Sequence, residues 1–178
     1  SDTRSVFFKD MHIPTSAVLG NPSKGFKQFL RTLTGGRITI GALGLGTAQG
    51  AFARALEYSQ EREAFGKSIN NFQGVSFKLS DMATQIEAAR HLVYYAAWKK
   101  DQGLPVIREA AMAKLFSSET AMQVTTEAIQ VLGGYGYIKE YDVERFFRDA
   151  KILEIGEGTS EVQRMIIAKE LIQSVQNI

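Results

Sequence analysis

The stretch VSFKLSDMATQIEAARHLVYYA, residues 75–96, decides the fold. Its apolar residues recur at alternating spacings of four and three, so on a helix they form one continuous stripe, with Asp81 and Glu87 off it. Gly103-Leu104-Pro105 follows and ends the helix. A stripe of this length predicts a long helix that packs against other helices. Its members are Val75, Leu79, Met82, Ile86, Ala89, Val93 and Ala96.

The same periodicity returns on the C-terminal side of this stretch. A second stripe, within residues 106–132, is rich in small side chains that suit close helix packing, and the capping pair Gly133-Gly134 follows it. Long helices joined by short connections predict an all-α fold, an antiparallel four-helix bundle. The second stripe consists of Ala111, Leu115, Ser118, Met122, Thr125, Ile129 and Leu132. The expected helices cover residues 25–60, 75–102, 106–132, 142–150 and 160–175, with a loop at 62–72.

The N-terminal residues differ from the rest of the chain. Ser5-Val6-Phe7-Phe8 is β-prone, and Asp10 to Pro14 leads into a second extended piece that ends at Gly20. A short N-terminal β segment is therefore expected in front of the bundle. The chain begins without Met and with a strand already in progress, which predicts a piece of a longer protein.

The composition is that of an ordinary globular domain. The chain has 178 residues, 44% hydrophobic and 22% charged, with 21 Lys plus Arg against 19 Asp plus Glu. This balance gives no sign of a nucleic-acid surface. Because Cys is absent, disulfides and thiolate zinc sites are excluded. The longest uncharged stretch, 38–53, is too short and too rich in Gly, Thr and Gln to cross a bilayer, so no membrane insertion is expected.

Three familiar site patterns find little support. Gly44-Leu45-Gly46-Thr47-Ala48-Gln49-Gly50 is similar to a dinucleotide-binding turn, but that motif needs a parallel strand downstream, where only helices are predicted. Close approach of a neighbouring helix explains these glycines better. His12 and His91 have no partner at metal-ligand spacing, so no metal site is predicted. No nucleophile elbow is present to support a hydrolase triad.

Two glycine-containing segments are candidates for binding or catalysis. Residues 130–137 place Gly133-Gly134 and Gly136 after a helix end, where bare backbone either approaches a flat or charged ligand or forms only a cap and a turn. Residues 155–160 place Glu157 between two glycines before a helix. This carboxylate is either a base with room for a substrate or a solvated loop residue.

Taken together, these segments resemble the C-terminal helical domain of the acyl-CoA dehydrogenases, flavoenzymes that desaturate acyl-CoA thioesters. Six motifs match that family in order and spacing across nearly the whole chain, which favours a site at both glycine segments. Residues 1–20 then resemble the last strands of the family's middle β-domain, and residues 21–178 its helical-bundle domain. The motifs are Gly35-Gly36-Arg37, residues 62–67, Phe72-Gln73, residues 130–134, residues 148–151 and Glu157-Gly158-Thr159.

The resemblance implies a role for each matching segment. Glu157 would be the base that removes the α-proton of the thioester while the β-hydrogen leaves as hydride to FAD. The adenosine-diphosphate half of FAD would be shared with a neighbouring subunit. Substrate-binding residues would be Thr34, Gly35, Gly36, Arg37 and Gly158. FAD-binding residues would be Arg62, Glu63, Ala64, Phe72, Gln73, Gln130, Val131, Leu132, Gly133, Gly134, Thr159, Ser160 and Glu161.

The chain departs from the family pattern near the expected site. Thr34 stands where an acid is usual, which removes one expected contact to the CoA arm. Gly156 stands where an aromatic residue commonly precedes the base, which indicates extra space near the acyl chain. Some branches of the family carry the base immediately before the arginine that matches Arg37. That position is Gly36 here, so Glu157 is expected to act alone.

The resemblance predicts α,β-desaturation of a short- or branched-chain acyl-CoA, with an electron-transfer flavoprotein as electron acceptor. It also implies a homodimer or homotetramer, cytoplasmic in a bacterium or in the mitochondrial matrix of a eukaryote. These residues alone are expected to fold and to be catalytically silent. Two alternatives remain: a relative without catalysis that serves as an assembly or binding module, and another flavoprotein oxidase of the same fold.

Overall fold

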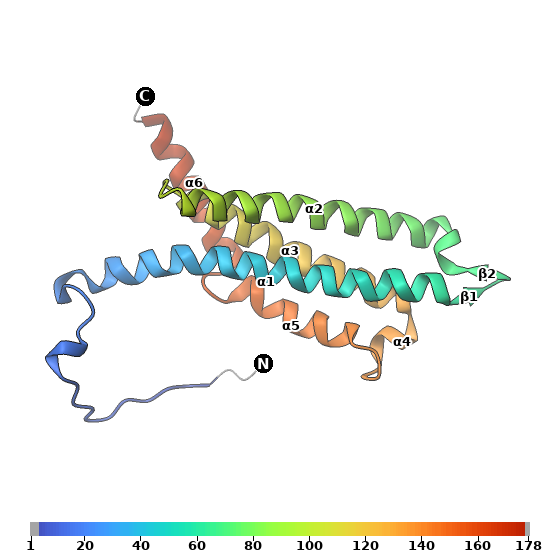
Figure 1. Ribbon diagram of the computed structural model, residues 1–178, viewed down its shortest axis with the longest axis horizontal. Helices are drawn as coiled ribbons and strands as arrows, with labels where there is room; N and C mark the ends of the chain where they lie inside the picture. Colours follow the sequence, from blue (N-terminus) through green and yellow to red (C-terminus); the bar gives the residue numbers. More distant parts are fainter. Residues whose placement is uncertain (1–3, 177–178) are drawn as a thin grey trace.

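The computed structural model describes residues 4–176, which are almost entirely helical from residue 25 onward (Figure 1). A small two-stranded antiparallel sheet interrupts the helices, with Glu63 paired to Ser68 and Ala64 to Lys67. The helices are α1 (Gly25–Glu61), α2 (Gln73–Asp101), α3 (Ile107–Leu132), α4 (Gly134–Tyr137), α5 (Val143–Ile155) and α6 (Ser160–Gln176). The strands are β1 (Glu63–Ala64) and β2 (Lys67–Ser68), and short 3-10 turns lie at Thr15–Ala17, Pro22–Lys24 and Ile69–Asn71.

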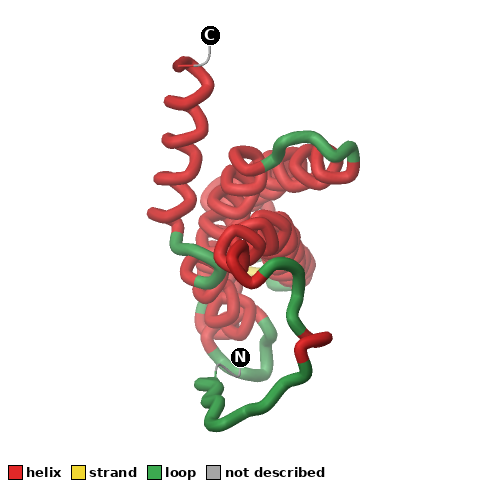
Figure 2. Tube along the Cα trace, turned by 90° about the vertical axis from the view of Figure 1, so that its left-hand side faces the viewer, coloured by secondary structure: helices red, strands yellow, loops and turns green. Residues whose placement is uncertain are grey.

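Helices α1, α2, α3 and α5 form the predicted antiparallel four-helix bundle (Figure 1). The hairpin β1–β2 reverses the chain between α1 and α2, and α4 lies at the same end of the bundle, between α3 and α5. Helix α6 packs on α3 and then extends away from the bundle (Figure 2). The prediction of an all-α bundle is confirmed.

The stripe on α2 buries as predicted, with six of its members from Leu79 to Ala96 forming the buried face of the helix. Helix α3 behaves differently, because it contacts α1, α2, α5 and α6. A helix packed on several sides buries more than one stripe. Fully buried residues of α3 therefore include positions outside the predicted stripe, such as Ala113, Lys114 and Val124, whereas Leu115 is only half-buried.

Small residues let α1 approach α3 closely. A Cβ added at Gly44 would lie 2.9 Å from the Ser117 carbonyl oxygen, and one at Gly41 would lie 3.3 Å from the Ala113 carbonyl. Within the Gly44–Gly50 segment, the explanation by helix packing is therefore correct at Gly44, and also at Gly50, where a Cβ would lie 3.0 Å from the Phe146 ring of α5. At Gly46 a Cβ would meet nothing within 4 Å, so helix contact does not explain this third glycine.

The strands expected between residues 4 and 20 are not formed in this chain. Residues 4–20 are exposed and contain one 3-10 turn but no strand within the described range, and residues 1–3 lie outside it. A strand needs a hydrogen-bonded neighbour, and the only described strand pairing is that of β1 with β2. Two helical segments also differ from expectation. Helix α5 continues to Ile155 instead of ending at residue 150, and residues 134–137 form a helical turn instead of a loop.

Candidate active site

Glu157 lies in the short connection between α5 and α6, in a backbone conformation that is uncommon for a residue with a side chain. Its φ angle is +53°, and that of the following Gly158 is +97°. The connection is fixed at both ends. The Gly156 N–H donates to the Ile152 carbonyl oxygen at 2.7 Å, and the Gln163 N–H donates to the Thr159 carbonyl oxygen at 3.0 Å. Left-handed backbone at such a position persists only where the surroundings hold it, and it is frequent at functional sites.

The connection places the Glu157 carboxylate directly over Gly36 of α1. A Cβ added at Gly36 would collide with both carboxylate oxygens and would lie 2.7 Å from Cδ of Glu157. The next residue, Arg37, is buried, and no hydrogen-bond partner for its Nε is present within residues 4–176. Burial lowers the pKa of the Arg37 guanidinium, and the negative charge of Glu157 opposes this shift. The predicted base and two predicted substrate residues, Gly36 and Arg37, thus lie together.

A cavity of about 510 Å³ reaches Gly36, the residue against which the Glu157 carboxylate lies, although Glu157 itself does not line it. It lies between the first turns of α1 and the α2–α3 connection, and three of the predicted substrate residues line it. The cavity is large enough for a small acyl or pantetheine group. Its lining residues are Arg31, Thr32, Thr34, Gly35, Gly36, Lys100, Val106 and Ile107.

Two buried side chains that the sequence analysis missed hold the Glu157 connection in place. The Lys114 ammonium donates to the Gly158 carbonyl oxygen at 2.8 Å. The Gln163 side-chain amide donates to the carbonyl oxygens of Glu157 at 3.3 Å and Gly158 at 2.9 Å. Both side chains are fully buried. No periodicity signals such contacts, because a lysine within a helix is ordinarily exposed.

A second cavity, of about 490 Å³, lies at the other end of the bundle. It brings Arg62 together with the backbone of Gly133, whose φ angle of +59° ends α3, and with Gly134. A Cβ at either glycine would meet nothing within 4 Å, so bare backbone faces open space there. The lining residues are Tyr58, Arg62, Ile69, Val131, Leu132, Gly133, Gly134, Tyr135 and Ile138.

Other residues predicted to bind FAD lie near this end but do not line the cavity. Glu63 and Ala64 form β1, and Gln73 begins α2. The Phe72 ring packs edge-on against Phe65, with 6.2 Å between centroids. Gln130 is exposed on the last turn of α3. Tyr58 and Tyr135, which do line the cavity, were missed because aromatic residues on a helix usually indicate core packing.

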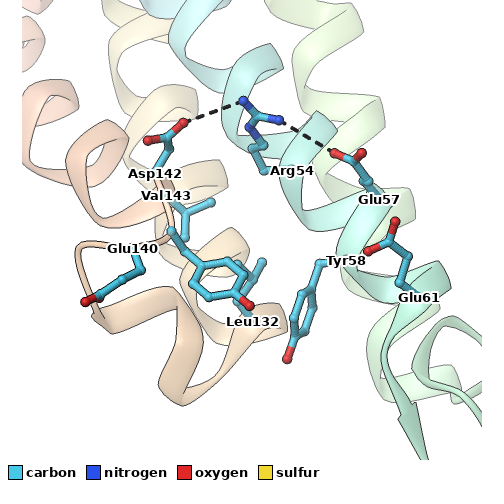
Figure 3. Close-up of a pocket in the computed structure, with 9 residues that line it drawn as sticks. Arg54, Glu57, Tyr58, Glu61, Leu132, Glu140, Asp142 and Val143 are labelled. Atoms are coloured by element: carbon cyan, nitrogen blue, oxygen red, sulfur yellow. Dashed lines mark ion pairs between the residues drawn. The ribbon is translucent and has the colours of Figure 1, made fainter.

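A third cavity, of about 320 Å³, is lined by acidic side chains (Figure 3) and shares Tyr58 and Leu132 with the second cavity. The guanidinium of Arg54 points into it and forms ion pairs with Asp142 at 3.5 Å and Glu57 at 3.7 Å. Glu61 and Glu140 also line it. Of the predicted site residues, only Leu132 contributes to this cavity.

The two groups of predicted site residues are far apart within one chain. Gly36 lies within α1, and Arg62 is the C-terminal cap of the same helix. At about 1.5 Å per residue, the two residues are separated by about 39 Å along the helix axis. Thr159, Ser160 and Glu161 lie at the Glu157 end, where α6 begins. Within residues 4–176, no three His, Cys, Asp or Glu side chains are grouped so that they could hold a metal ion. In the same range no helix is long and apolar enough to span a membrane.

Residues 23–172 match the family model described as "Acyl-CoA dehydrogenase, C-terminal domain". A probable acyl-CoA dehydrogenase of Bacillus subtilis is 53% identical over 173 residues, covering 97% of this chain and 46% of that protein. The mitochondrial short-chain specific acyl-CoA dehydrogenase of Bos taurus is 47% identical over 177 residues, covering 99% and 43%. Similar sequences thus occur in bacteria and in mitochondria.

Solved structures agree with these matches. The butyryl-CoA dehydrogenase of Megasphaera elsdenii superposes with a TM-score of 0.91 at 53% identity, over 93% of this chain and 43% of that one. A chain of the structure described for the electron transferring flavoprotein of Acidaminococcus fermentans gives 0.91 at 51% identity, over 92% and 43%. The chain thus spans less than half the length of the relatives it matches. From its sequence, fold and these matches together, the chain belongs to the acyl-CoA dehydrogenase family and corresponds to its C-terminal domain.

Proposed function

We propose that this chain is the helical part of an FAD-dependent acyl-CoA dehydrogenase that desaturates a short- or branched-chain acyl-CoA between Cα and Cβ. The observation that carries the proposal is that the Glu157 carboxylate lies against Gly36, a residue that lines the 510 Å³ cavity. A carboxylate oxygen of Glu157 takes the α-proton of the thioester, which lies in this cavity. A positioned base of this kind is what general base catalysis requires.

The residues of the second cavity fit the diphosphate half of FAD. Arg62 is exposed there, and no ion pair to it is found within residues 4–176, which leaves its guanidinium available for a phosphate oxygen. The open backbone of Gly133 and Gly134 allows a ligand to approach closely. Bound FAD supplies the acceptor for the β-hydride of the substrate.

The distance between the two site regions supports a shared cofactor site. About 39 Å of α1 separates Gly36 from Arg62, which is more than one FAD molecule spans. The second cavity of one chain therefore serves the catalytic region of a neighbouring chain, and the protein is a homodimer or homotetramer. The apolar side chains of Val6, Phe7 and Phe8 are exposed, as expected if residues 4–20 complete a β-domain in the full-length protein.

The relatives support the substrate, electron acceptor and compartment that we propose. The butyryl-CoA dehydrogenase of Megasphaera elsdenii favours a short acyl chain, and Gly156 before the base leaves additional space for a branch. The match to a chain of the Acidaminococcus fermentans flavoprotein structure favours an electron-transfer flavoprotein as acceptor. The protein then acts in the bacterial cytoplasm or the mitochondrial matrix, according to its source.

The test is Glu157→Gln in the full-length protein that carries this domain. Gln keeps the shape of the side chain but cannot accept the proton, so binding of acyl-CoA and FAD is retained. Turnover falls about 10²–10⁴-fold, the usual effect of removing a general base. Steady-state turnover and the bleaching of bound flavin by butyryl-CoA measure it. Full turnover by the variant would show that another residue is the base.

A further inference from the structure

The connection between α5 and α6 is held by two fully buried polar side chains from different helices. Lys114 lies in the N-terminal third of α3, and Gln163 lies in the first turn of α6. The Gly158 carbonyl oxygen accepts from Lys114 Nζ at 2.8 Å and from Gln163 Nε2 at 2.9 Å. A carbonyl oxygen has two lone pairs, so this acceptor is saturated. The same amide reaches the Glu157 carbonyl oxygen at 3.3 Å.

These contacts are specific to the left-handed backbone at this point. With φ angles of +53° and +97°, Glu157 and Gly158 turn their consecutive carbonyl groups toward the bundle interior, where Gln163 reaches both. A Cβ at Gly158 would lie 2.8 Å from Gln163 Nε2, so a side chain at Gly158 would displace the amide. The hydrogen bonds and the backbone conformation therefore depend on each other.

Burial of the Lys114 ammonium costs free energy, and within the described chain only its contact with the α5–α6 connection explains it. An apolar side chain of similar volume would fill this position without desolvating a charge. No ion pair to Lys114 is found within residues 4–176, and its only hydrogen bond found there is the one to the Gly158 carbonyl. Burial lowers the pKa of the Lys114 ammonium, and more distant carboxylates, among them Glu154 and Glu157, oppose this shift. The ammonium is thus held in the core by the connection that carries Glu157.

We propose that Lys114 and Gln163 are positioning residues for the catalytic base: they clamp two consecutive carbonyls so that the Glu157 carboxylate stays over Gly36. This inference rests on the proposed function, since it takes Glu157 to be the base. Neither side chain contacts the substrate in this scheme. Each acts through the main chain of the connection (Figure 1), which would otherwise relax toward a right-handed conformation and move the carboxylate away from α1.

The test compares Lys114→Met and Gln163→Met with Thr125→Val in the full-length, FAD-loaded protein. Thr125 is also fully buried on α3, but its hydroxyl bonds only to the carbonyls of its own helix, at Ala121 and Met122. It controls for the loss of a buried polar group without an effect on the connection. Each variant is measured for melting temperature, FAD content, KM and kcat with butyryl-CoA, and the kinetic isotope effect with α-deuterated butyryl-CoA.

The positioning role predicts that Lys114→Met and Gln163→Met lower kcat about tenfold to a hundredfold, the scale of misplacing a reacting group by about 1 Å. KM and FAD content stay near the parent values, and the isotope effect rises because proton removal becomes slower. Amide hydrogen exchange at residues 156–160 becomes faster in both variants. Thr125→Val keeps the parent kcat and isotope effect, even where its melting temperature falls.

Two outcomes would overturn the inference. The first is that Gln163→Met and Lys114→Met lose melting temperature but keep the parent kcat and isotope effect, as expected of core residues. The second is that kcat falls in parallel with FAD content. If Lys114→Met does not fold, Gln163→Met alone decides, because it removes both amide contacts. Glu157→Gln is measured alongside. If that variant remains active, the proposed function fails. If it is inactive while the Lys114 and Gln163 variants keep the parent kcat, only the positioning role is rejected.

Discussion

The carboxylate of Glu157 occupies the space that a side chain at Gly36 would need. The two residues come from opposite ends of the chain, and their contact joins α1 to the connection between α5 and α6. Only a glycine on α1 lets the carboxylate lie against the helix backbone. A carboxylate carried at position 36 or at position 157 therefore reaches the same point beside the cavity, although the two positions belong to different elements.

Gly36→Ala should stabilise the fold while lowering turnover. Alanine is favoured over glycine within a helix by up to about 1 kcal/mol, and the atoms that its Cβ meets belong to the mobile end of the Glu157 side chain. The carboxylate moves aside, so kcat falls. Gly46→Ala, where a Cβ meets nothing within 4 Å, should raise the melting temperature without changing kcat. Equal kcat in both variants would contradict this account of the site.

Moving the carboxylate from the connection to α1 should recover part of the activity. In the double variant Glu157→Gly with Gly36→Glu, the new glutamate reaches the space that the old one left. Turnover should exceed that of Glu157→Gly by roughly tenfold, because a base is again present although less well positioned. Steady-state turnover with butyryl-CoA measures the difference. No recovery in a folded, FAD-loaded double variant would argue against the shared position.

Gly44→Ala should destabilise the bundle, in contrast to Gly46→Ala. Its Cβ would lie 2.9 Å from the Ser117 carbonyl oxygen, and backbone cannot move aside as a side-chain end does. Overpacking of about 1–3 kcal/mol outweighs the gain of about 1 kcal/mol in helix propensity. Thermal unfolding followed by circular dichroism should show a lower melting temperature for Gly44→Ala and a higher one for Gly46→Ala. A higher melting temperature for both would mean that α1 and α3 are not in tight contact.

Arg62→Ala should weaken the retention of FAD more than it alters the chemistry. Loss of a charge-assisted contact to a phosphate costs about 1.5–3 kcal/mol, or roughly tenfold to a hundredfold in affinity. Dilution and ultrafiltration of the full-length protein, with absorbance of the retained flavin, measure it. Arg54→Ala is the matched control, because it removes the same charge from the neighbouring acidic cavity, where Asp142 and Glu57 pair with it (Figure 3). Equal FAD loss in both variants would exclude a specific role for Arg62.

Glu109 should make the stability of the domain depend on pH. Burial raises the pKa of its carboxyl, but hydrogen bonds from Lys99 at 3.0 Å and Arg108 at 2.8 Å outweigh burial, so the pKa is lowered. A carboxyl with a lowered pKa stabilises the fold above its unfolded pKa of about 4.3. This stabilisation is lost as the pH falls through the lower pKa of the folded state.

Glu109→Gln should therefore lower the free energy of unfolding by about 1.5–3 kcal/mol at pH 7, since the hydrogen bonds from two charged donors lose the negative charge of their acceptor. The difference from the parent protein should shrink as the pH falls below about 4. Urea unfolding at several pH values measures it. Glu87→Gln, which loses an exposed pair with Arg90, should have a much smaller effect at every pH. A pH-independent difference for Glu109→Gln would show that packing, and not charge, is responsible.

The sequence predicts the buried residues of a helix best where the helix packs through one face only. The stripe on α2 from Leu79 to Ala96 is buried as expected, because that helix contacts the bundle on one face. On α3 the same reasoning finds only part of the buried surface, since periodicity assumes a single buried face. Lys114 is the extreme case: a lysine is ordinarily placed in solvent, and nothing near it in the sequence shows that a carbonyl lies across the core.

The candidate site depends on contacts that local sequence does not contain. Glu157 and Gly36 meet because two distant elements pack together, and only the family resemblance placed them in one site. Arg62 and Gly133, predicted in the same way, line one cavity, whereas Phe72 packs against Phe65 beside it. The strands expected between residues 4 and 20 fail for a related reason, because β propensity needs a partner strand to take effect.

Helix α1 runs without interruption from Gly25 to Glu61 and carries Gly36 near one end and Arg62 at its C-terminal cap. One inserted or deleted residue between them would rotate one end against the other by about 100° and shift it by about 1.5 Å. A substitution in this segment leaves its two ends in register, whereas a change in its length does not. Exchanges between homologous enzymes should therefore place their junctions outside α1 and transfer the helix whole.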